Sequence, residues 1–317
     1  MKFWSTAAIA ASIVGVAITN AFAQEQPAVA QNMFGIAFGA DVATAKNRLK
    51  KHCDKLKTHT SNTPTLPIAR ASETQLICLG YSANDVNLAE AAFIFGDDRL
   101  SMIEVYGGAY AAFETLPGEI ISYSGFAVKP EILTLAQSEL DRMLLMTMNA
   151  VHAHMHFWKS PYLPTNNGAP TSFSSSAAQP AMIRFGERSE ILRPEFESAC
   201  AFLAEQHIAE PWLATEPAVQ TQLDCFGYVY AGFPRKIEAV FGDGILEQVW
   251  ILTAAGEEAR IRAALEAEYG NAEIVNDTWE VFAEGTVALR KDKPEVLLVS
   301  GRVAPAFREV FEEASDE

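Results

Sequence analysis

Apolar residues recur with two different periods in the first part of the chain. Between residues 41 and 55 they recur at helical spacing, and this stripe predicts a helix with Cys53 in its last turns. Further on, apolar and polar residues alternate, which predicts a strand with Cys78 on one face and Leu79 and Tyr81 on the other. The two patterns together predict a helix packed on a sheet.

The next stretches predict further strands and helices. Strand-like runs on both sides of tight Gly-Asp turns predict hairpins over residues 92–106 and 238–252. A helix is predicted over residues 257–269, followed by three strands within residues 279–300. Residues 130–158 carry apolar side chains at helical spacing, and we expect one long helix there.

An internal duplication explains why these patterns occur twice. Two segments align without a gap at a constant offset of 147 residues, and the motif TQLxCxGY begins at Thr74 and again at Thr221. The same offset superposes the cysteines in two pairs, Cys53 with Cys200 and Cys78 with Cys225.

The duplication also selects a disulfide pairing. Four cysteines allow three pairings, but an ancestral unit with two cysteines must have closed its bond internally before it was copied. We therefore expect the bonds Cys53–Cys78 and Cys200–Cys225. A site of four thiolates on a metal is disfavoured, because the chain has no C-x-x-C pair.

These elements predict an α+β fold. We expect two tandem repeats, each an antiparallel sheet covered by helices and stapled by one disulfide. The first repeat spans residues 33–160 and the second spans residues 181–309. Residues 161–180, rich in Pro, Asn, Ser and Gly, are expected to form a linker between them.

The first 23 residues have the features of a secretory signal peptide. Lys2 precedes a short apolar run over residues 7–18, and Ala21-Phe22-Ala23 has the small-x-small pattern of a cleavage site. An uncleaved anchor is the alternative, but the run is shorter than the ~20 residues that span a bilayer. We expect cleavage after Ala23 and a periplasmic or secreted protein without an integral membrane segment.

The charge balance bears on the class of partner. The chain carries 24 Lys and Arg residues against 40 Asp and Glu residues, a formal net charge of −16. An acidic protein does not neutralise phosphates, so we expect no nucleic-acid partner.

The motifs that identify common catalytic mechanisms are absent from the sequence. It contains no G-x-S-x-G elbow, no P-loop, no H-E-x-x-H pair and no G-x-G-x-x-G after a strand. We therefore expect a protein that is not an enzyme and that uses no cofactor.

Three histidines lie close together in the sequence. On the long helix expected here, His152 and His156 share one flank while His154 lies on the other. His152 and His156 could thus supply two ligands to a metal ion. The alternative is a polar helix flank that happens to contain histidines.

The face of the cysteine strand that lies opposite the helix is a candidate binding surface. It is expected to present four side chains: Leu79, Tyr81, Phe226 and Tyr228. Exposed aromatic residues suit protein recognition. The alternative is that another part of the chain covers them.

The repeated unit resembles a known fold. A Phe-Gly pair before the helix, one disulfide per unit and the hairpins at Gly96 and Gly242 resemble the tandem α/β units of beta-lactamase inhibitory protein and of SmpA/OmlA-type outer-membrane assembly lipoproteins. Members of both families are binding or scaffold proteins. The resemblance implies a non-catalytic periplasmic binding or envelope-assembly protein that recognises a protein or peptide partner. A histidine-based metal-binding periplasmic protein is the alternative.

Overall fold

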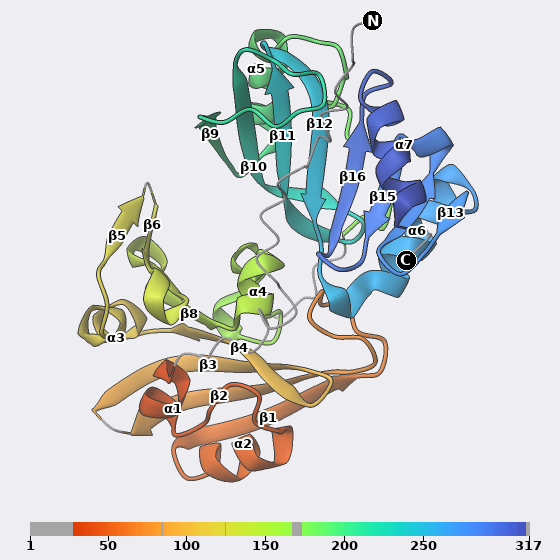
Figure 1. Cartoon of the computed structure of the whole chain (residues 1–317). Coiled ribbons are helices and arrows are strands. Elements are labelled where there is room, and N and C mark those ends of the chain that lie inside the picture. The colour runs from red at the N-terminus through yellow and green to blue at the C-terminus, as the bar shows by residue number, and fades with distance from the viewer. Residues whose placement is uncertain (1–27, 84, 124, 167–172, 315–317) are drawn as a thin grey trace, which may run out of the picture.

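The structure is a computed structural model that describes residues 28–83, 85–123, 125–166 and 173–314. The proposed signal peptide, with its cleavage site after Ala23, lies outside the described residues. The described chain contains two eight-stranded antiparallel sheets, which Figure 1 shows in the lower and the upper half of the molecule. We refer to residues 28–166 as the first unit and to residues 173–314 as the second unit.

Apart from one extra helix at the start of the first unit, the described α-helices and strands follow the same order in both units. In the first unit they are α1 (Val29–Phe34), α2 (Val42–Leu49), β1 (Cys53–Ser61), β2 (Glu73–Ala83), β3 (Val86–Gly96), β4 (Arg99–Tyr106), α3 (Ala109–Thr115), β5 (Ile121–Tyr123), β6 (Phe126–Lys129), β7 (Thr134–Gln137), β8 (Arg142–Met146) and α4 (Met148–His152). In the second unit they are α5 (Ser189–Ala199), β9 (Phe202–Ile208), β10 (Gln220–Tyr230), β11 (Phe233–Gly242), β12 (Ile245–Leu252), α6 (Glu258–Tyr269), β13 (Ile274–Val275), β14 (Trp279–Phe282), β15 (Val287–Arg290), β16 (Glu295–Val299) and α7 (Ala304–Glu313).

The duplication extends through the whole of each sheet. The strand order of the first sheet is β1-β2-β3-β4-β8-β7-β6-β5, and the second sheet has the same order with β9-β10-β11-β12-β16-β15-β14-β13. The long helix expected over residues 130–158 is therefore wrong. In its place the first unit has β7, β8 and the short helix α4, which correspond to β15, β16 and α7.

Burial on both faces explains why these strands resemble a helix in the sequence. Every residue of β8 is buried, so its apolar residues form a continuous run instead of alternating with polar ones. The connections are single turns in which Leu133 and Asp141 adopt positive φ values of 50° and 42°. Such turns leave little trace in the sequence when the residue is not glycine.

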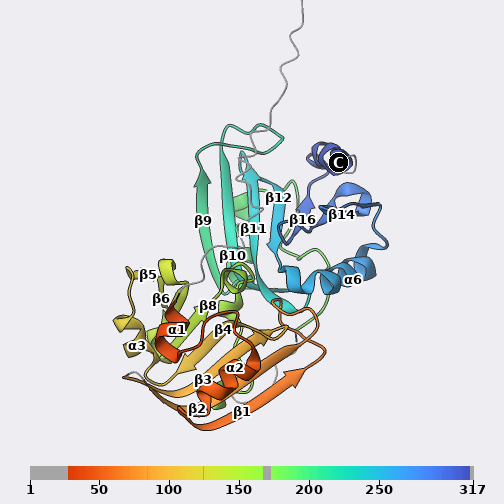
Figure 2. The same cartoon turned by 60° about the horizontal axis from the view of Figure 1, so that its bottom comes forward.

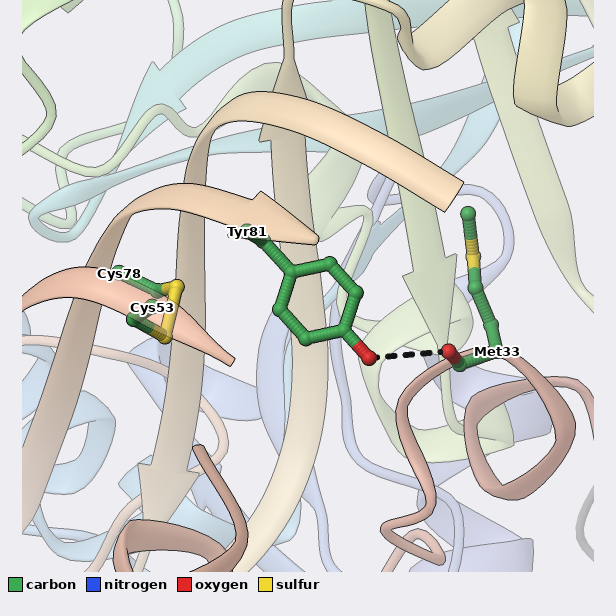
Figure 3. The surroundings of a disulfide bond; sticks show 4 residues. All are labelled: Met33, Cys53, Cys78 and Tyr81. Carbon is green, nitrogen blue, oxygen red and sulfur yellow. Dashed lines mark hydrogen bonds between the residues drawn. A yellow bond between two sulfur atoms is a disulfide. The ribbon is translucent and has the colours of Figure 1, made fainter. Parts of the chain in front are cut away.

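Both expected disulfides are present. Cys53 is bonded to Cys78 and Cys200 to Cys225, and the described chain has no free cysteine. The helix expected to hold Cys53 ends earlier, at Leu49, so Cys53 is the first residue of β1. The first bond thus joins two neighbouring strands (Figure 3). Two disulfides fit a protein that folds in an oxidising, extracytoplasmic compartment.

Helices cover the sheets only in part. In the first unit, residues of α1, α2 and α3 join the core on the face of the sheet that holds Cys78. In the second unit, α5 and α6 contribute to the corresponding core around Cys225. The α+β class is thus confirmed, whereas the expected cover of the sheets by helices is only partial. No helix within the described residues is long and apolar enough to span a membrane.

The two units meet through a loop of the first unit. The loop between β1 and β2 approaches the start of α6, where Arg260 donates hydrogen bonds to the carbonyls of Leu66 (2.7 Å) and Ala69 (3.0 Å). Arg70 donates in the opposite direction, to the carbonyl of Ala255 at 3.2 Å.

The described parts of the expected linker, residues 161–180, pack against both units. Leu163 is fully buried in the first unit. The amides of Ala231 and Gly232 in the second unit bond to the carbonyls of Ser176 and Ser174. Residues 167–172 lie outside the described residues.

Candidate functional site

Tyr81 lies on the other face of β2 from Leu79, which corrects the expectation that they share one. Gly80 adopts a φ of +64°, and this positive value interrupts the alternation of the strand. Tyr81 therefore joins the core around Cys78, where it is 1% exposed and its hydroxyl donates to the carbonyl of Met33 at 3.1 Å (Figure 3). Leu79 packs partly buried against the opposite face.

The same separation occurs in the second unit. Gly227 has a φ of +84°, and the pairing of β10 with β11 shifts register between Phe226 and Tyr228. Tyr228 consequently packs against the core around Cys225. Phe226 lies on the opposite face, where it contacts the rings of His154 and Phe157 of the first unit. Phe226, and not Tyr228, therefore lies at the junction between the units.

The three histidines do not lie on one helix. Helix α4 ends at His152, and His154 adopts a left-handed conformation with a φ of 52°. The Nε2 atom of His152 lies 3.3 Å from the carbonyl oxygen of Pro294 in the second unit. The rings of His154 and His156 are neighbours, 5.2 Å between centroids. The shared flank expected for His152 and His156 is therefore wrong.

Burial keeps His154 and His156 neutral. It lowers the pKa of His154 to about 2, with further contributions from the nearby His156, Lys236 and His152. It lowers the pKa of His156 to about 4, aided by Arg142. The buried Nδ1 atom of His154 has no hydrogen-bond partner among the described residues. Within those residues no three His, Cys, Asp or Glu side chains are grouped so that they could hold a metal ion.

An aromatic row connects the two units next to these histidines. We call it the junction cluster; its members are Tyr123, Phe126, His154, His156, Phe157, Phe202 and Phe226. Tyr123 stacks on Phe126 with 5.0 Å between ring centroids, and Phe126 meets Phe202 edge-on at 6.3 Å. Phe202 is 5.6 Å from Phe226, which in turn contacts the rings of His154 and Phe157.

One end of the junction cluster is open to solvent. Tyr123 is 51% exposed and Phe202 is 36% exposed, and the neighbouring Ile120 and Ile121 are about as exposed as Phe202. Tyr123 belongs to β5 and Phe202 to β9, which are the edge strands of their sheets. Figures 1 and 2 both place these two edges on the same side of the molecule.

A buried polar network holds the segment that carries His156 and Phe157. Arg142, fully buried on β8, donates to Glu104 (2.8 Å) and to the carbonyls of His156 (3.1 Å) and Trp158 (2.8 Å). Glu104 also accepts a bond from the amide of Ser160 at 2.7 Å. Buried charges are retained where they are paired and hydrogen-bonded in this way. The network fixes one wall of the junction cluster to the first sheet.

A cleft lies between the units, next to α6. It is an open cleft of about 750 Å³, and its walls include Thr65, Trp158, Phe233, Glu257 and Arg260. Two of its three charged side chains are already engaged, because Glu257 binds the buried Arg235 and Arg260 binds backbone carbonyls of the first unit. The third is Glu268 on α6.

The sequence indicated only part of this site. Phe226 and the histidines were singled out beforehand, whereas Tyr123, Phe126, Phe157 and Phe202 were not. These four residues come from segments far apart in the chain, and only the packing of the units brings them together. The available signal was the alternation of apolar and polar residues at Ile121, Ser122 and Tyr123, which is typical of a short strand.

Comparison with known proteins does not assign a role to this site. No protein-family model matches the chain, and no curated protein or solved structure shows a significant match.

Proposed function

We propose that the chain is a non-catalytic binding protein of the periplasm that recognises an extended peptide or protein segment at the junction cluster. The observation that carries this proposal is the exposed aromatic end of the cluster between two free strand edges. Aromatic side chains contribute large contact areas at protein interfaces. A free strand edge supplies backbone hydrogen bonds to an added strand.

The geometry favours a partner with an apolar or aromatic anchor. Tyr123 and Phe202 present aromatic rings to solvent, and the network of Arg142 and Glu104 that supports the cluster is already bonded within the chain. A ligand side chain inserted between these rings would bury apolar surface at roughly 25 cal/mol per Å² before the costs of association. Export through the proposed signal peptide would place this surface in the periplasm, so the partner would be a periplasmic protein or peptide.

Selection from a random linear peptide library tests the proposal. We expect the mature protein to enrich peptides that share an aromatic or large aliphatic residue. Their binding should weaken about tenfold or more in the variants Tyr123→Ser and Phe202→Ser, since each removes an aromatic ring that the bound peptide would cover. Val275→Ser is the matched control, because Val275 is 65% exposed on β13, the counterpart of β5 in the second unit.

Two results would contradict this function. One is that no peptide family is enriched. The other is that Val275→Ser weakens binding as much as Phe202→Ser does, because the site would then lie elsewhere.

Metal binding by His152 and His156 is not proposed as the function. The helix that was to align them is absent, and His152 lies against Pro294 of the second unit. That alternative stays a prediction from the sequence.

A further inference from the structure

Basic residues are concentrated in one short segment of this acidic chain. Six of the 24 Lys and Arg residues fall between residues 46 and 57, where Asp54 is the one acidic residue. We call this segment the basic edge; its cations are Lys46, Arg48, Lys50, Lys51, Lys55 and Lys57.

The cations of the basic edge lack acidic partners. In the described part of the chain none of the six forms an ion pair with a carboxylate. The Nε atom of Arg48 is buried without a hydrogen-bond partner there. Most basic residues of the second unit, in contrast, are paired, for example Arg184 with Glu195 and Arg262 with Glu280. The first unit thus carries uncompensated positive charge at one place.

These cations flank the free edge of a strand. Strand β1 ends the first sheet and pairs with β2 alone among the described strands. Lys55 and Lys57 stand opposite Leu79 and Ile77 and share their face of the sheet. Helix α2, with Lys46 and Arg48, packs against the other face. Figure 2 shows β1 along the outer border of the first sheet with α2 beside it.

We propose that the basic edge binds an acidic polypeptide segment, which adds to β1 as a further strand. The outward backbone groups of β1 would pair with the added strand. In an extended segment, alternate side chains point to opposite faces. Carboxylates spaced two residues apart would therefore all lie on one face of the added strand, where Lys55 and Lys57 can meet them.

Charge also favours a peptide over an anionic membrane. A strand added to β1 lies within the Debye length of ~8 Å of the basic edge, so the cations of this edge dominate its electrostatic interaction with the protein. An anionic membrane would instead face the charge of the whole molecule. That molecule carries a net charge of −16. The site is separate from the junction cluster, since β1 and β5 lie at opposite ends of the first sheet.

A synthetic peptide of alternating Glu and Thr, labelled with a fluorophore, tests the proposal on the mature protein. We expect saturable binding that weakens with added salt and about tenfold or more in the variant Lys55→Glu/Lys57→Glu. Hydrogen exchange should show new protection of β1 amides when the peptide binds. The charge-matched control is Lys159→Glu/Arg308→Glu, at exposed positions outside the basic edge, and it should bind the peptide like the unmodified protein.

Four results would overturn the proposal. Equal weakening in the control variant would show a general charge effect. Binding without protection of β1 would exclude strand addition, and binding to phosphatidylglycerol vesicles in place of the peptide would identify a membrane surface. If the peptide does not bind at all, the lysines only prevent edge-to-edge association of sheets, a role that lysines often have on edge strands.

Discussion

Single residues determine which side chains reach the junction between the units. Gly80 and Gly227 each reverse the alternation of a long strand, and as a result Tyr81 and Tyr228 turn into the cores while Leu79 and Phe226 remain on the opposite face. The sequence motif TQLxCxGY contained this glycine twice. Its effect on the alternation was not predicted, because a glycine in a strand is compatible with either φ sign.

The buried histidines predict a pH-dependent stability. In the unfolded chain both have a pKa near 6.5, whereas burial lowers the folded pKa of His156 to about 4 and that of His154 to about 2. The unfolded state therefore binds more protons below pH ~6.5. The free energy of unfolding should fall as the pH drops from about 6.5 toward 4, by up to about 1.4 kcal/mol per pH unit for each histidine.

Chemical denaturation at several pH values measures this effect. The variant His156→Gln should show a shallower decline than the unmodified protein, because one of the two protonation sites is gone. His207→Gln is the control, since His207 is exposed on β9, and its decline should be unchanged. If stability is the same at pH 5 and pH 7, the neutral burial of the two histidines is refuted.

At the scale of elements, the sequence predicted well wherever turns or alternation are explicit. Helix α6 and strands β14 to β16 were predicted close to their observed bounds, and the hairpins at Gly96 and Gly242 were predicted at the right turns, although β3 and β11 begin several residues earlier than expected. It failed for β7 and β8, two short runs that are buried except at Gln137 and that have the spacing of a helix. Comparison of the two copies was the missing check, because the three strands predicted after α6 implied three strands at the same place in the first unit.

Strand β2 offers a test of the glycine that interrupts it. In Gly80→Ala the residue would hold an unfavourable positive φ, and its Cβ would lie 2.2 Å from a carboxylate oxygen of Asp54. We expect a loss of about 1–3 kcal/mol in the free energy of unfolding. Gly301→Ala should change it by less than about 0.5 kcal/mol, because Gly301 lacks a positive φ and has open space around it. Equal effects of both substitutions on urea denaturation would show that Gly80 imposes no special backbone conformation.

At the scale of the whole molecule, the position of one unit against the other creates the candidate site. The junction cluster needs β5 and β6 of the first unit beside β9 and β10 of the second. Neither unit contains it alone, so a sequence read one unit at a time predicts the sheets but not this site. The contact of the β1–β2 loop with α6 is one of the links that hold this arrangement.

Gly256, just before α6, is the most sensitive point of that link. A Cβ atom there would lie 2.4 Å from the carbonyl oxygen of Pro67 and 2.8 Å from the amide nitrogen of Ala69, both of them backbone atoms of the loop. In Gly256→Ala the loop must therefore move away, and the bonds from Arg260 to Leu66 and Ala69 lengthen or break. Each sheet keeps its own core and disulfide, so both units should remain folded.

We expect this substitution to loosen the two units rather than unfold them. Small-angle scattering should give a larger radius of gyration, and thermal unfolding should separate into two transitions, since weakly coupled units lose their cooperativity. Peptides selected on the junction cluster should bind less tightly, because Phe126 and Phe202 no longer stay in contact. Gly301→Ala again serves as the control. If Gly256→Ala leaves scattering and peptide affinity unchanged, then contacts other than this loop determine how the units sit together, and the junction cluster does not depend on it.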